Sequence, residues 1–186
     1  MTTNSNSGHS VADHSGMDRR HFLKVSGTAS AGMSLGFFLP ERAHAADTPQ
    51  LNVWVEIEAK DTIVIRYARA EMGQGSMTSA PMMIAEELEV DWKKVRVVDV
   101  PAHDNLRRKR VYGDMASVGS RTIRNSQDYL RKAGAAARIM LVEAAAQRFG
   151  VSASECKASM GMVVHSASGK KLSYGQLAGD AAKLTP

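Results

Sequence analysis

Cysteine is nearly absent from this sequence of 186 residues, because the only thiol belongs to Cys156. A single cysteine excludes an intrachain disulfide, so the fold is not held together by disulfide bonds. It also excludes an iron–sulfur cluster bound by this chain, since such a cluster needs several thiolate ligands.

The sequence also lacks the residue patterns of a self-contained catalytic site. It has no nucleotide-binding P-loop, no Ser–His–Asp order and no cluster of metal ligands at the usual spacing. His165 lies beside Val163 and Val164 without a second ligand, which favours a strand residue over a metal ligand. Met82 and Met83 have helical spacing, and we interpret them as core side chains. No pair of residues suggests a catalytic acid and base.

The composition is that of a folded domain. Hydrophobic residues make up 44% of the chain and charged residues 23%, which is typical of globular proteins. The length predicts one domain with enough buried surface for a core. The net charge of +5 is diffuse apart from the run Arg107-Arg108-Lys109-Arg110. We interpret that run as a solvated loop or a protein-contact surface, and we expect no nucleic-acid partner.

Residues 1–45 are predicted to be a twin-arginine signal peptide. Arg19-Arg20 precedes a weakly apolar run over residues 25–39, as in export signals of this type. The run is too short and too rich in glycine for a stable transmembrane helix. Ala43-His44-Ala45 fits a cleavage site. We therefore predict export to the periplasm, and an uncleaved membrane anchor is the alternative.

The predicted mature domain, residues 46–186, begins with two strands. Apolar and polar residues alternate over residues 51–57 and again over residues 62–67, which is the period of half-buried strands. Lys60-Asp61 between them predicts a hairpin turn. A third strand is predicted over residues 95–100, where β-branched residues are frequent. Because a helix separates it from the hairpin, the pattern predicts a strand–helix–strand unit.

Two longer helices are predicted to cover this sheet. The first runs from the Gly73-Gln74-Gly75 turn to Glu89, and a hydroxyl of Ser76, Thr78 or Ser79 is expected to cap it. The second spans residues 126–149, with Asn125 as its N-cap.

The C-terminal part is predicted to contain shorter elements. Strands are expected at residues 156–159, 162–165 and 171–172, and Ser173 is expected to cap a last helix over residues 174–182. The predicted fold class is therefore α+β, with a small mixed sheet covered by two helices.

The Gly73-Gln74-Gly75 turn is the first candidate site. Two glycines let the backbone approach a ligand closely, and the N–H groups at the start of a helix suit an anion such as a phosphate. The amide of Gln74 offers two donors and an acceptor for a polar ring edge. A plain strand-to-helix connection is the alternative interpretation.

Residues 101–124 contain the second candidate site, because long irregular stretches in compact domains are frequently functional. Gly119 allows a close backbone approach, and Ser120 adds a hydroxyl group, as do Ser117 and Thr122. Arg121 or Arg124 could form a forked contact with a phosphate.

A series of short motifs runs in order along the chain. They are Glu71-Met72-Gly73-Gln74-Gly75, Thr78, Pro81, Met82, Ala85-Glu86-Glu87-Leu88, Asp91-Trp92-Lys93-Lys94-Val95, Ser117-Val118-Gly119-Ser120-Arg121-Thr122, Leu130-Arg131-Lys132-Ala133-Gly134-Ala135-Ala136-Ala137-Arg138 and Lys171-Leu172-Ser173-Tyr174-Gly175-Gln176-Leu177. The series resembles the large, molybdenum-binding subunit of the xanthine dehydrogenase superfamily, in particular the isoquinoline 1-oxidoreductase beta-subunit branch. Those subunits are several times longer, and this chain resembles their N-terminal part.

The resemblance implies a molybdenum–molybdopterin cofactor in its cytosine dinucleotide form. The residues that it implies as cofactor-binding are Gly73, Gln74, Gly75, Thr78, Gly119, Ser120 and Arg121. Gln74 would hydrogen-bond the pterin or an oxo group, and the glycines, Ser120 and Arg121 would hold the pterin or its phosphate. Many relatives have two glycines where this chain has Val118-Gly119, which changes the expected backbone path.

The implied reaction is hydroxylation of an aldehyde or N-heteroaromatic carbon with water. Electrons would pass to a separate [2Fe-2S] subunit, with a cytochrome c as a further acceptor. The family's catalytic base is a glutamate in a Gly-Val-Gly-Glu context, and this sequence has no such motif. We therefore expect no turnover without the rest of the large subunit. The alternative is a non-catalytic binding or assembly subunit derived from the same fold.

Overall fold

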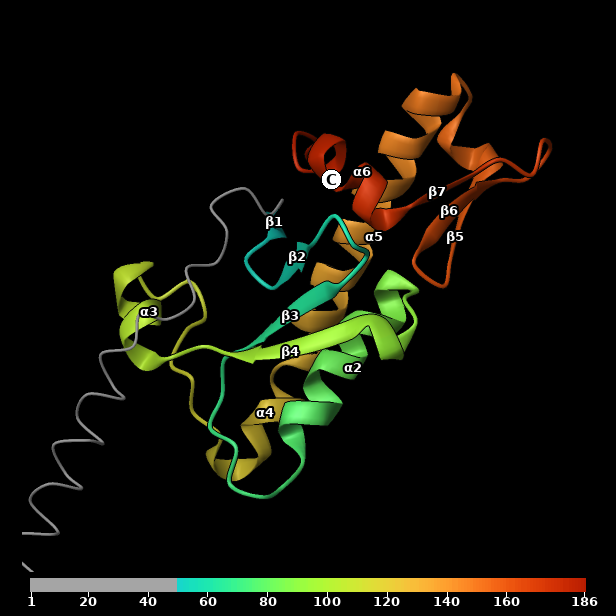
Figure 1. Ribbon diagram of the computed structural model, residues 1–186. Helices are drawn as coiled ribbons and strands as arrows, with labels where there is room; N and C mark the ends of the chain where they lie inside the picture. Colours follow the sequence, from blue (N-terminus) through green and yellow to red (C-terminus); the bar gives the residue numbers. More distant parts are fainter. Residues whose placement is uncertain (1–49) are drawn as a thin grey trace, which may run out of the picture. The chain divides into compact units, whose positions relative to one another are not determined.

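A four-stranded sheet lies at the centre of the residues that the computed structural model describes, 50–186 (Figure 1). Its strands, in spatial order, are β1 Gln50–Asn52, β2 Val55–Ile57, β3 Ile63–Tyr67 and β4 Val95–Asp99. β2 and β3 pair antiparallel, whereas β3 and β4 pair parallel, with Ile63 opposite Val95. Helix α2, Ser76–Leu88, connects the parallel pair. The predicted strand–helix–strand unit is therefore confirmed.

The single strand predicted over residues 51–57 is wrong, because the structure divides it into β1 and β2. Val53 and Trp54 form a turn, and Asn52 pairs back with Val55. The Asn52 Oδ1 atom accepts the main-chain N–H of Trp54 at 3.0 Å and that of Val55 at 3.1 Å. Asparagine favours turns through such local hydrogen bonds. One side chain therefore overrides the alternation of apolar residues.

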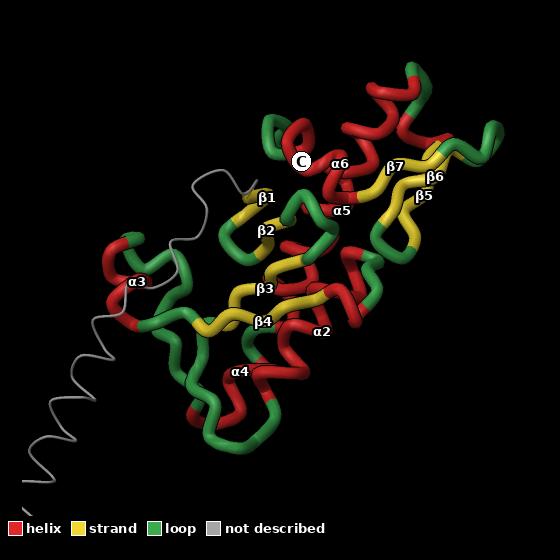
Figure 2. The backbone as a smooth tube through the Cα atoms, in the orientation of Figure 1, coloured by secondary structure: helices red, strands yellow, loops and turns green. Residues whose placement is uncertain are grey.

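Helices α2 and α5 pack together against one face of this sheet, as Figures 1 and 2 show. α5 spans Gln127–Phe149, and its Gly134 lies so close to α2 that a Cβ atom there would stand 2.5 Å from the Ile84 carbonyl oxygen. Arg131 of α5 also pairs with Glu87 of α2 at 2.9 Å. The predicted α+β class, a small mixed sheet covered by two helices, is confirmed. The largest buried apolar side chains of this core include Ile57, Ile63, Ile65, Ile84, Leu88, Leu141 and Leu177.

A second, antiparallel sheet follows α5. Its strands are β5 Cys156–Ser159, β6 Met162–His165 and β7 Lys171–Ser173, and helix α6, Tyr174–Ala181, begins directly after β7. Ser173 caps α6 as predicted, because its side chain and that of Gln176 each accept the other residue's main-chain N–H. The Tyr174 hydroxyl donates to the Leu88 carbonyl at 2.7 Å. This hydrogen bond fastens α6 to the end of α2.

The stretch 101–124, predicted to be irregular, contains two short helices. α3 spans Ala102–Arg107 and α4 spans Arg121–Arg124, with a 3₁₀ turn, Val118–Ser120, immediately before α4. Such short helices do not repeat long enough to show a helical period in the sequence. Asn125 ends α4, and Ser126 precedes α5. The predicted cap at Asn125 is therefore wrong.

The predicted signal peptide, residues 1–45, lies outside the described residues, and so does its Arg19-Arg20 pair. Between residues 50 and 186, no helix has the length and apolar character needed to cross a bilayer. Export stays a prediction.

Candidate functional site

The Gly73-Gln74-Gly75 turn forms an exposed loop between β3 and α2. Gly73 has a φ of 89° and Gly75 a φ of 75°, which lie in the left-handed region that residues with a Cβ avoid. Apart from the adjoining residues, no atom of the described chain lies within 4 Å of the position that a Cβ would take on either residue. The backbone of this loop is therefore open to a ligand.

Glu71 holds the loop from within, a role that was not predicted from the sequence. One carboxylate oxygen accepts the N–H of Gly73 at 2.8 Å and that of Gly75 at 3.1 Å, and the other accepts the N–H of Met77 at 2.7 Å. The hydrogen bond from Met77, followed by those from the glycines, lowers the pKa of Glu71. An external phosphate at this helix start would have to displace the carboxylate. The available signal was a glutamate two residues ahead of the first glycine.

The hydroxyl groups at the start of α2 do not cap it, which corrects the predicted role of Ser76, Thr78 or Ser79. Gly75 is the N-cap residue and has no side chain with which to cap the helix, and the Glu71 carboxylate accepts the Met77 N–H in its place. Ser79 Oγ instead donates to the Gly75 carbonyl at 3.2 Å. Thr78 is exposed in the first turn of α2.

The side-chain amide of Gln74 is engaged within the loop. Its Oε1 accepts the N–H of Met72 at 2.6 Å, and its Nε2 donates to the Ala70 carbonyl at 3.0 Å and to Ser76 Oγ at 2.6 Å. Ser76 Oγ also lies 2.6 Å from the Tyr67 hydroxyl, and both residues are buried. Burial raises the pKa of Tyr67. A ligand that hydrogen-bonds Gln74 would take over one of these internal contacts.

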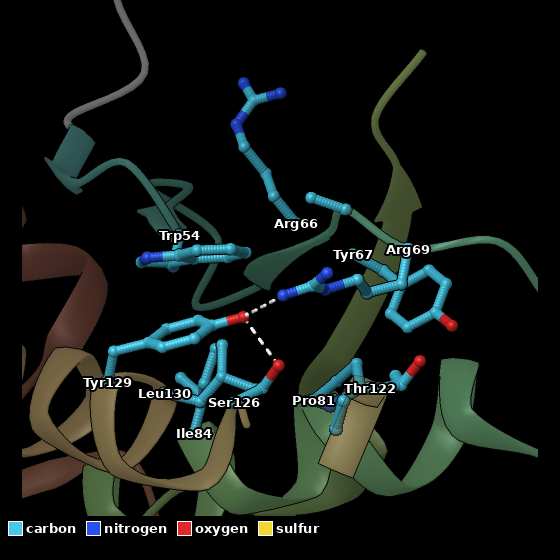
Figure 3. A pocket seen from close by; sticks show the side chains of 12 residues that line it. Trp54, Arg66, Tyr67, Arg69, Pro81, Ile84, Thr122, Ser126, Tyr129 and Leu130 are labelled. Carbon is cyan, nitrogen blue, oxygen red and sulfur yellow. Dashed lines mark hydrogen bonds between the residues drawn. The ribbon is translucent and has the colours of Figure 1, made fainter. Parts of the chain in front are cut away.

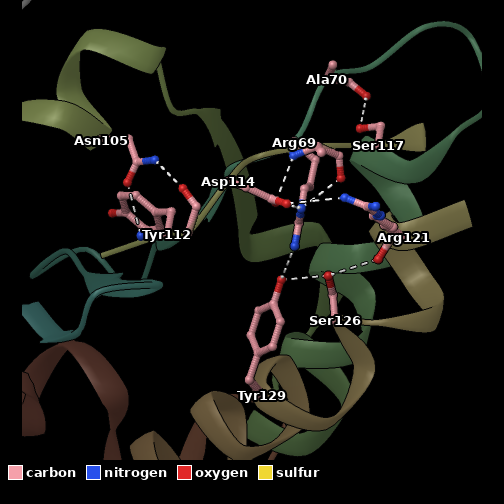
Figure 4. A network of polar contacts seen from close by, with 11 residues as sticks. Arg69, Ala70, Asn105, Tyr112, Asp114, Ser117, Arg121, Ser126 and Tyr129 are labelled. Atoms are coloured by element: carbon pink, nitrogen blue, oxygen red, sulfur yellow. Dashed lines mark hydrogen bonds and ion pairs between the residues drawn. The ribbon is translucent and has the colours of Figure 1, made fainter. Parts of the chain in front are cut away.

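The second predicted segment meets the first at one carbonyl oxygen. Ser117 Oγ donates to the Ala70 carbonyl at 2.9 Å (Figure 4), and the same oxygen accepts the Gln74 amide. Gly119 and Ser120 then follow with φ values of 62° and 59°. Two successive left-handed residues, one of them a serine, are strained and persist only where neighbouring contacts hold them. The fold thus brings both candidate segments together.

Arg121 lies at the exposed side of the second segment. Its Nη1 is 3.3 Å from Asp114 Oδ2, while Arg69 Nη1 donates to Asp114 Oδ1 at 2.8 Å. The main-chain N–H of Ala116 and the two arginines lower the pKa of Asp114. Within residues 50–186, no other ion pair or hydrogen bond engages the side chain of Arg121. Most of its N–H groups are therefore available to an anion.

The cavity next to the site is too small for a cofactor. It measures about 10 Å³ (Figure 3), which is room for roughly one water molecule. Trp54 and Tyr129 stack at its side with ring centroids 5.4 Å apart, and Arg66, which pairs with Glu56, also lines it. A larger groove lies between α5 and β5, but none of the predicted site residues lines it. The two loops therefore offer a larger ligand an open surface and no enclosed cavity of sufficient size.

Metal-ligating side chains do not gather in the described part of the chain. No group of three or more His, Cys, Asp or Glu residues there could hold a metal ion. His165 lies buried at the end of β6, with its Nδ1 2.7 Å from Ser168 Oγ, so its interpretation as a strand residue is confirmed. The site consists of hydrogen-bonding groups, open backbone and the largely available guanidinium of Arg121.

The chain belongs to the molybdopterin cofactor-binding domain family, which matches residues 12–185. It is 35% identical over 175 residues to the isoquinoline 1-oxidoreductase subunit beta of Brevundimonas diminuta. It is 32% identical over 177 residues to the membrane-bound aldehyde dehydrogenase (pyrroloquinoline-quinone) of Gluconacetobacter polyoxogenes. These matches cover 90% and 89% of this chain but only 22% and 21% of the relatives. The chain thus spans about a fifth of their length.

Solved structures show the same fold. Quinoline 2-oxidoreductase from Pseudomonas putida 86 superposes with a TM-score of 0.54 at 18% identity, covering 67% of this chain and 15% of that chain. Reconstituted CO dehydrogenase from Oligotropha carboxidovorans gives a TM-score of 0.50 at 20% identity, covering 66% and 15%. The resemblance to a molybdenum hydroxylase large subunit is confirmed. The domain is a molybdopterin-binding domain of an oxidoreductase of this type.

The two loops fit a molybdopterin-type cofactor at the open glycines and at Arg121, but not at the start of α2. The open backbone at Gly73, Gly75 and Gly119 fits a flat polar ring system, and the available N–H groups of Arg121 fit a phosphate. The start of α2 does not fit the phosphate, because Glu71 already accepts the Met77 N–H and the Gly75 carbonyl accepts those of Thr78 and Ser79. This donor set favours the segment around Arg121 for the phosphate contact.

Proposed function

We propose that this chain forms the cofactor-cradling part of a molybdenum hydroxylase that oxidises an aldehyde or N-heteroaromatic carbon with water. The observation that carries the proposal is the meeting of both predicted segments at the Ala70 carbonyl, which accepts Gln74 at 3.0 Å and Ser117 at 2.9 Å. The names of the two curated relatives support an N-heterocycle or an aldehyde as the substrate class.

Each predicted site residue has a specific role in this proposal. Gln74 exchanges one internal hydrogen bond for one to the pterin or an oxo group, and Thr78, which is exposed in the first turn of α2, offers its hydroxyl to the same cofactor. Gly73, Gly75 and Gly119 let the backbone approach the ring, while Ser120 and Arg121 hold the phosphate. When bound, the molybdenum cofactor supplies the two-electron oxidation chemistry. This chain contributes binding and orientation.

Further parts of the proposal concern partners. The cofactor has the cytosine dinucleotide form, and the electrons leave through a [2Fe-2S] subunit and a cytochrome c in the periplasm. The single cysteine places any iron–sulfur cluster outside these residues, because they cannot ligate one. The rest of the large subunit supplies the catalytic glutamate. Residues 46–186 alone should therefore not oxidise aldehydes or N-heterocycles with an artificial electron acceptor.

The test measures cofactor retention in an enzyme that is completed with the rest of the large subunit. Gln74→Ala and Arg121→Ala should each lower molybdenum per protein by roughly tenfold to a hundredfold, because a cofactor group loses its partner in a desolvated site. Gln147→Ala is the matched control, since its side-chain amide on α5 hydrogen-bonds Glu143 at 3.3 Å and no other group among residues 50–186. Full molybdenum content in both loop variants, with unchanged melting temperatures, would favour the non-catalytic binding or assembly subunit.

A further inference from the structure

One guanidinium group, that of Arg69, joins three parts of the molecule. Its Nη1 donates to Asp114 Oδ1 at 2.8 Å and to the Ala116 carbonyl at 2.7 Å, and its Nη2 donates to the Tyr129 hydroxyl at 3.1 Å. The side chain is only 12% exposed. Arg69 lies two residues after the end of β3 in the chain. It therefore fastens the end of the sheet to the 114–116 loop and to α5, as Figure 4 shows.

These contacts continue into a closed ring that includes Arg121. On one arm, Asp114 pairs with the Arg121 side chain at 3.3 Å. On the other arm, the Tyr129 hydroxyl donates to Ser126 Oγ at 2.6 Å, and Ser126 Oγ donates to the Arg121 carbonyl at 3.4 Å (Figure 4). Arg121 is thus held at its side chain and at its main chain, and both arms begin at Arg69.

The strained turn of the candidate site lies in the chain between two residues that the ring holds. Gly119 and Ser120, both left-handed, lie between Ala116, whose carbonyl Arg69 holds, and Arg121. A left-handed serine relaxes unless its surroundings prevent it. Further hydrogen bonds on this segment run from Ser117 Oγ to the Ala70 carbonyl, from the Ala116 N–H to Asp114 Oδ1 and from the Arg121 N–H to the Val118 carbonyl. The ring adds the contacts that tie the two ends of the turn to β3 and α5.

We propose that Arg69 is a positioning residue that aims the Arg121 guanidinium and holds the Gly119–Ser120 turn for the phosphate ester of the cofactor, without touching the cofactor itself. This inference rests on the proposed function. Lysine cannot replace Arg69, because a compact ammonium group does not reproduce the planar fork that reaches three acceptors in fixed directions. The charge alone is therefore not sufficient.

The first test measures hydrogen exchange in the full chain. Arg69→Lys should speed exchange of the amides of residues 116–122 by roughly tenfold through local opening. Arg131→Lys is the matched control, because Arg131 also joins two elements, through Glu86 and Glu87, but belongs to no part of the ring. Asp114→Asn should also speed exchange of these amides. In the Arg69→Lys background it should speed exchange little further, as expected for one coupled network. Exchange equal to that of the control would overturn the inference and leave the proposed function intact.

The second test measures molybdenum and phosphate per protein in the completed enzyme. Arg69→Lys should lower both as Arg121→Ala does, whereas Arg131→Lys should not. Millimolar guanidinium, but not methylammonium, should restore cofactor retention to Arg69→Ala. The inference would also be overturned if Arg69→Lys showed faster hydrogen exchange but kept its full cofactor while Arg121→Ala lost the cofactor. Full cofactor in the Arg121→Ala and Gln74→Ala variants would instead overturn the proposed function.

A milder variant covers the case in which Arg69→Lys does not fold. Tyr129→Phe removes only the hydroxyl that links Arg69 to Ser126, while the stacked ring on Trp54 is kept. It should speed the hydrogen exchange of the same amides, with the largest effect at Arg121 and its neighbours. Unchanged exchange there would count against the ring.

Discussion

The Glu71 carboxylate accepts the main-chain N–H of Met77 at 2.7 Å, so a negative charge from the same chain lies at the N-terminus of α2. The same carboxylate shapes the loop through Gly73 and Gly75. A carboxylate is favourable at this position because the helix start carries partial positive charge. The loop conformation is therefore linked to the ionisation of one exposed side chain.

Glu71→Gln should remove an acid-sensitive part of the stability. The main-chain hydrogen bonds lower the pKa of Glu71 below its ordinary value of 4.5. Ionised Glu71 therefore stabilises the folded state above that value, and this contribution is lost as the pH falls through the lowered pKa. Thermal unfolding between about pH 6 and about pH 3 should show a steeper acid-side loss of Tm in the wild type than in the variant.

Glu143→Gln is the control for this experiment. Glu143 is exposed on α5 and is contacted by the Gln147 amide, with no main-chain donor. Its replacement should leave the wild-type pH dependence in place. Superimposable curves for the wild type and Glu71→Gln would show that the carboxylate does not stabilise the loop.

Gly134→Ala should destabilise the fold through the contact between α2 and α5. The added Cβ would stand 2.5 Å from the Ile84 carbonyl oxygen and 2.9 Å from Glu87 Cβ. A helix backbone cannot move aside as the end of a flexible side chain does, so we expect a loss of about 1–3 kcal/mol in urea unfolding. Gly179→Ala in α6 meets nothing within 4 Å and should instead gain about 0.5–1 kcal/mol. Equal stability of both variants would contradict the close packing.

The elements that could be predicted from the sequence are those whose pattern repeats. α5 buries side chains at helical intervals, among them Leu130, Gly134, Ala137 and Leu141, and this period is visible in the residues themselves. β3 and β4 were recognisable from their β-branched residues, although β3 is buried on both faces and β4 has no fully buried residue. The turn at Asn52 could not be predicted in the same way, because two hydrogen bonds to one side chain decide it. The helices α3 and α4 are too short to show a period.

The candidate site was predictable in its parts but not in its assembly. Glycine spacing and the resemblance identified both loops, because left-handed turns and ligand-approaching backbones need residues without a Cβ. The contact between Ser117 and Ala70 joins residues 47 positions apart. Arg69 likewise lies 60 positions from Tyr129. Such contacts depend on how the sheet and α5 pack, and the local sequence does not carry that information.

Tyr174→Phe should weaken the link between α6 and α2. The Tyr174 hydroxyl donates to the Leu88 carbonyl at 2.7 Å in a fully buried position. Its removal leaves a buried carbonyl without a partner, and we expect a loss of about 1–3 kcal/mol in denaturant unfolding. A variant as stable as the wild type would show that another donor replaces the hydroxyl.

The same variant should change the alkaline limb of the stability curve. Burial raises the pKa of Tyr174 above its ordinary value of 10.0, so the folded state keeps the phenol proton after the unfolded chain has released it. Stability from this group is complete below pH 10 and falls as the pH rises further. Tyr174→Phe should therefore lose less stability than the wild type when the pH is raised above 10. An unchanged alkaline slope would contradict this sign.

Export by the twin-arginine route is expected from Arg19-Arg20, the weakly apolar run and Ala43-His44-Ala45. Replacing both arginines by lysine should keep the precursor in the cytoplasm, whereas wild-type periplasmic protein should begin at Ala46 by N-terminal sequencing. Arg107→Lys with Arg110→Lys is the control, because both residues are exposed and lie outside the signal. Lysine keeps the charge and loses the guanidinium fork, so selective failure of the first variant would show recognition of the arginine pair itself. Normal export of that variant, or a mature start far from Ala46, would rule the route out.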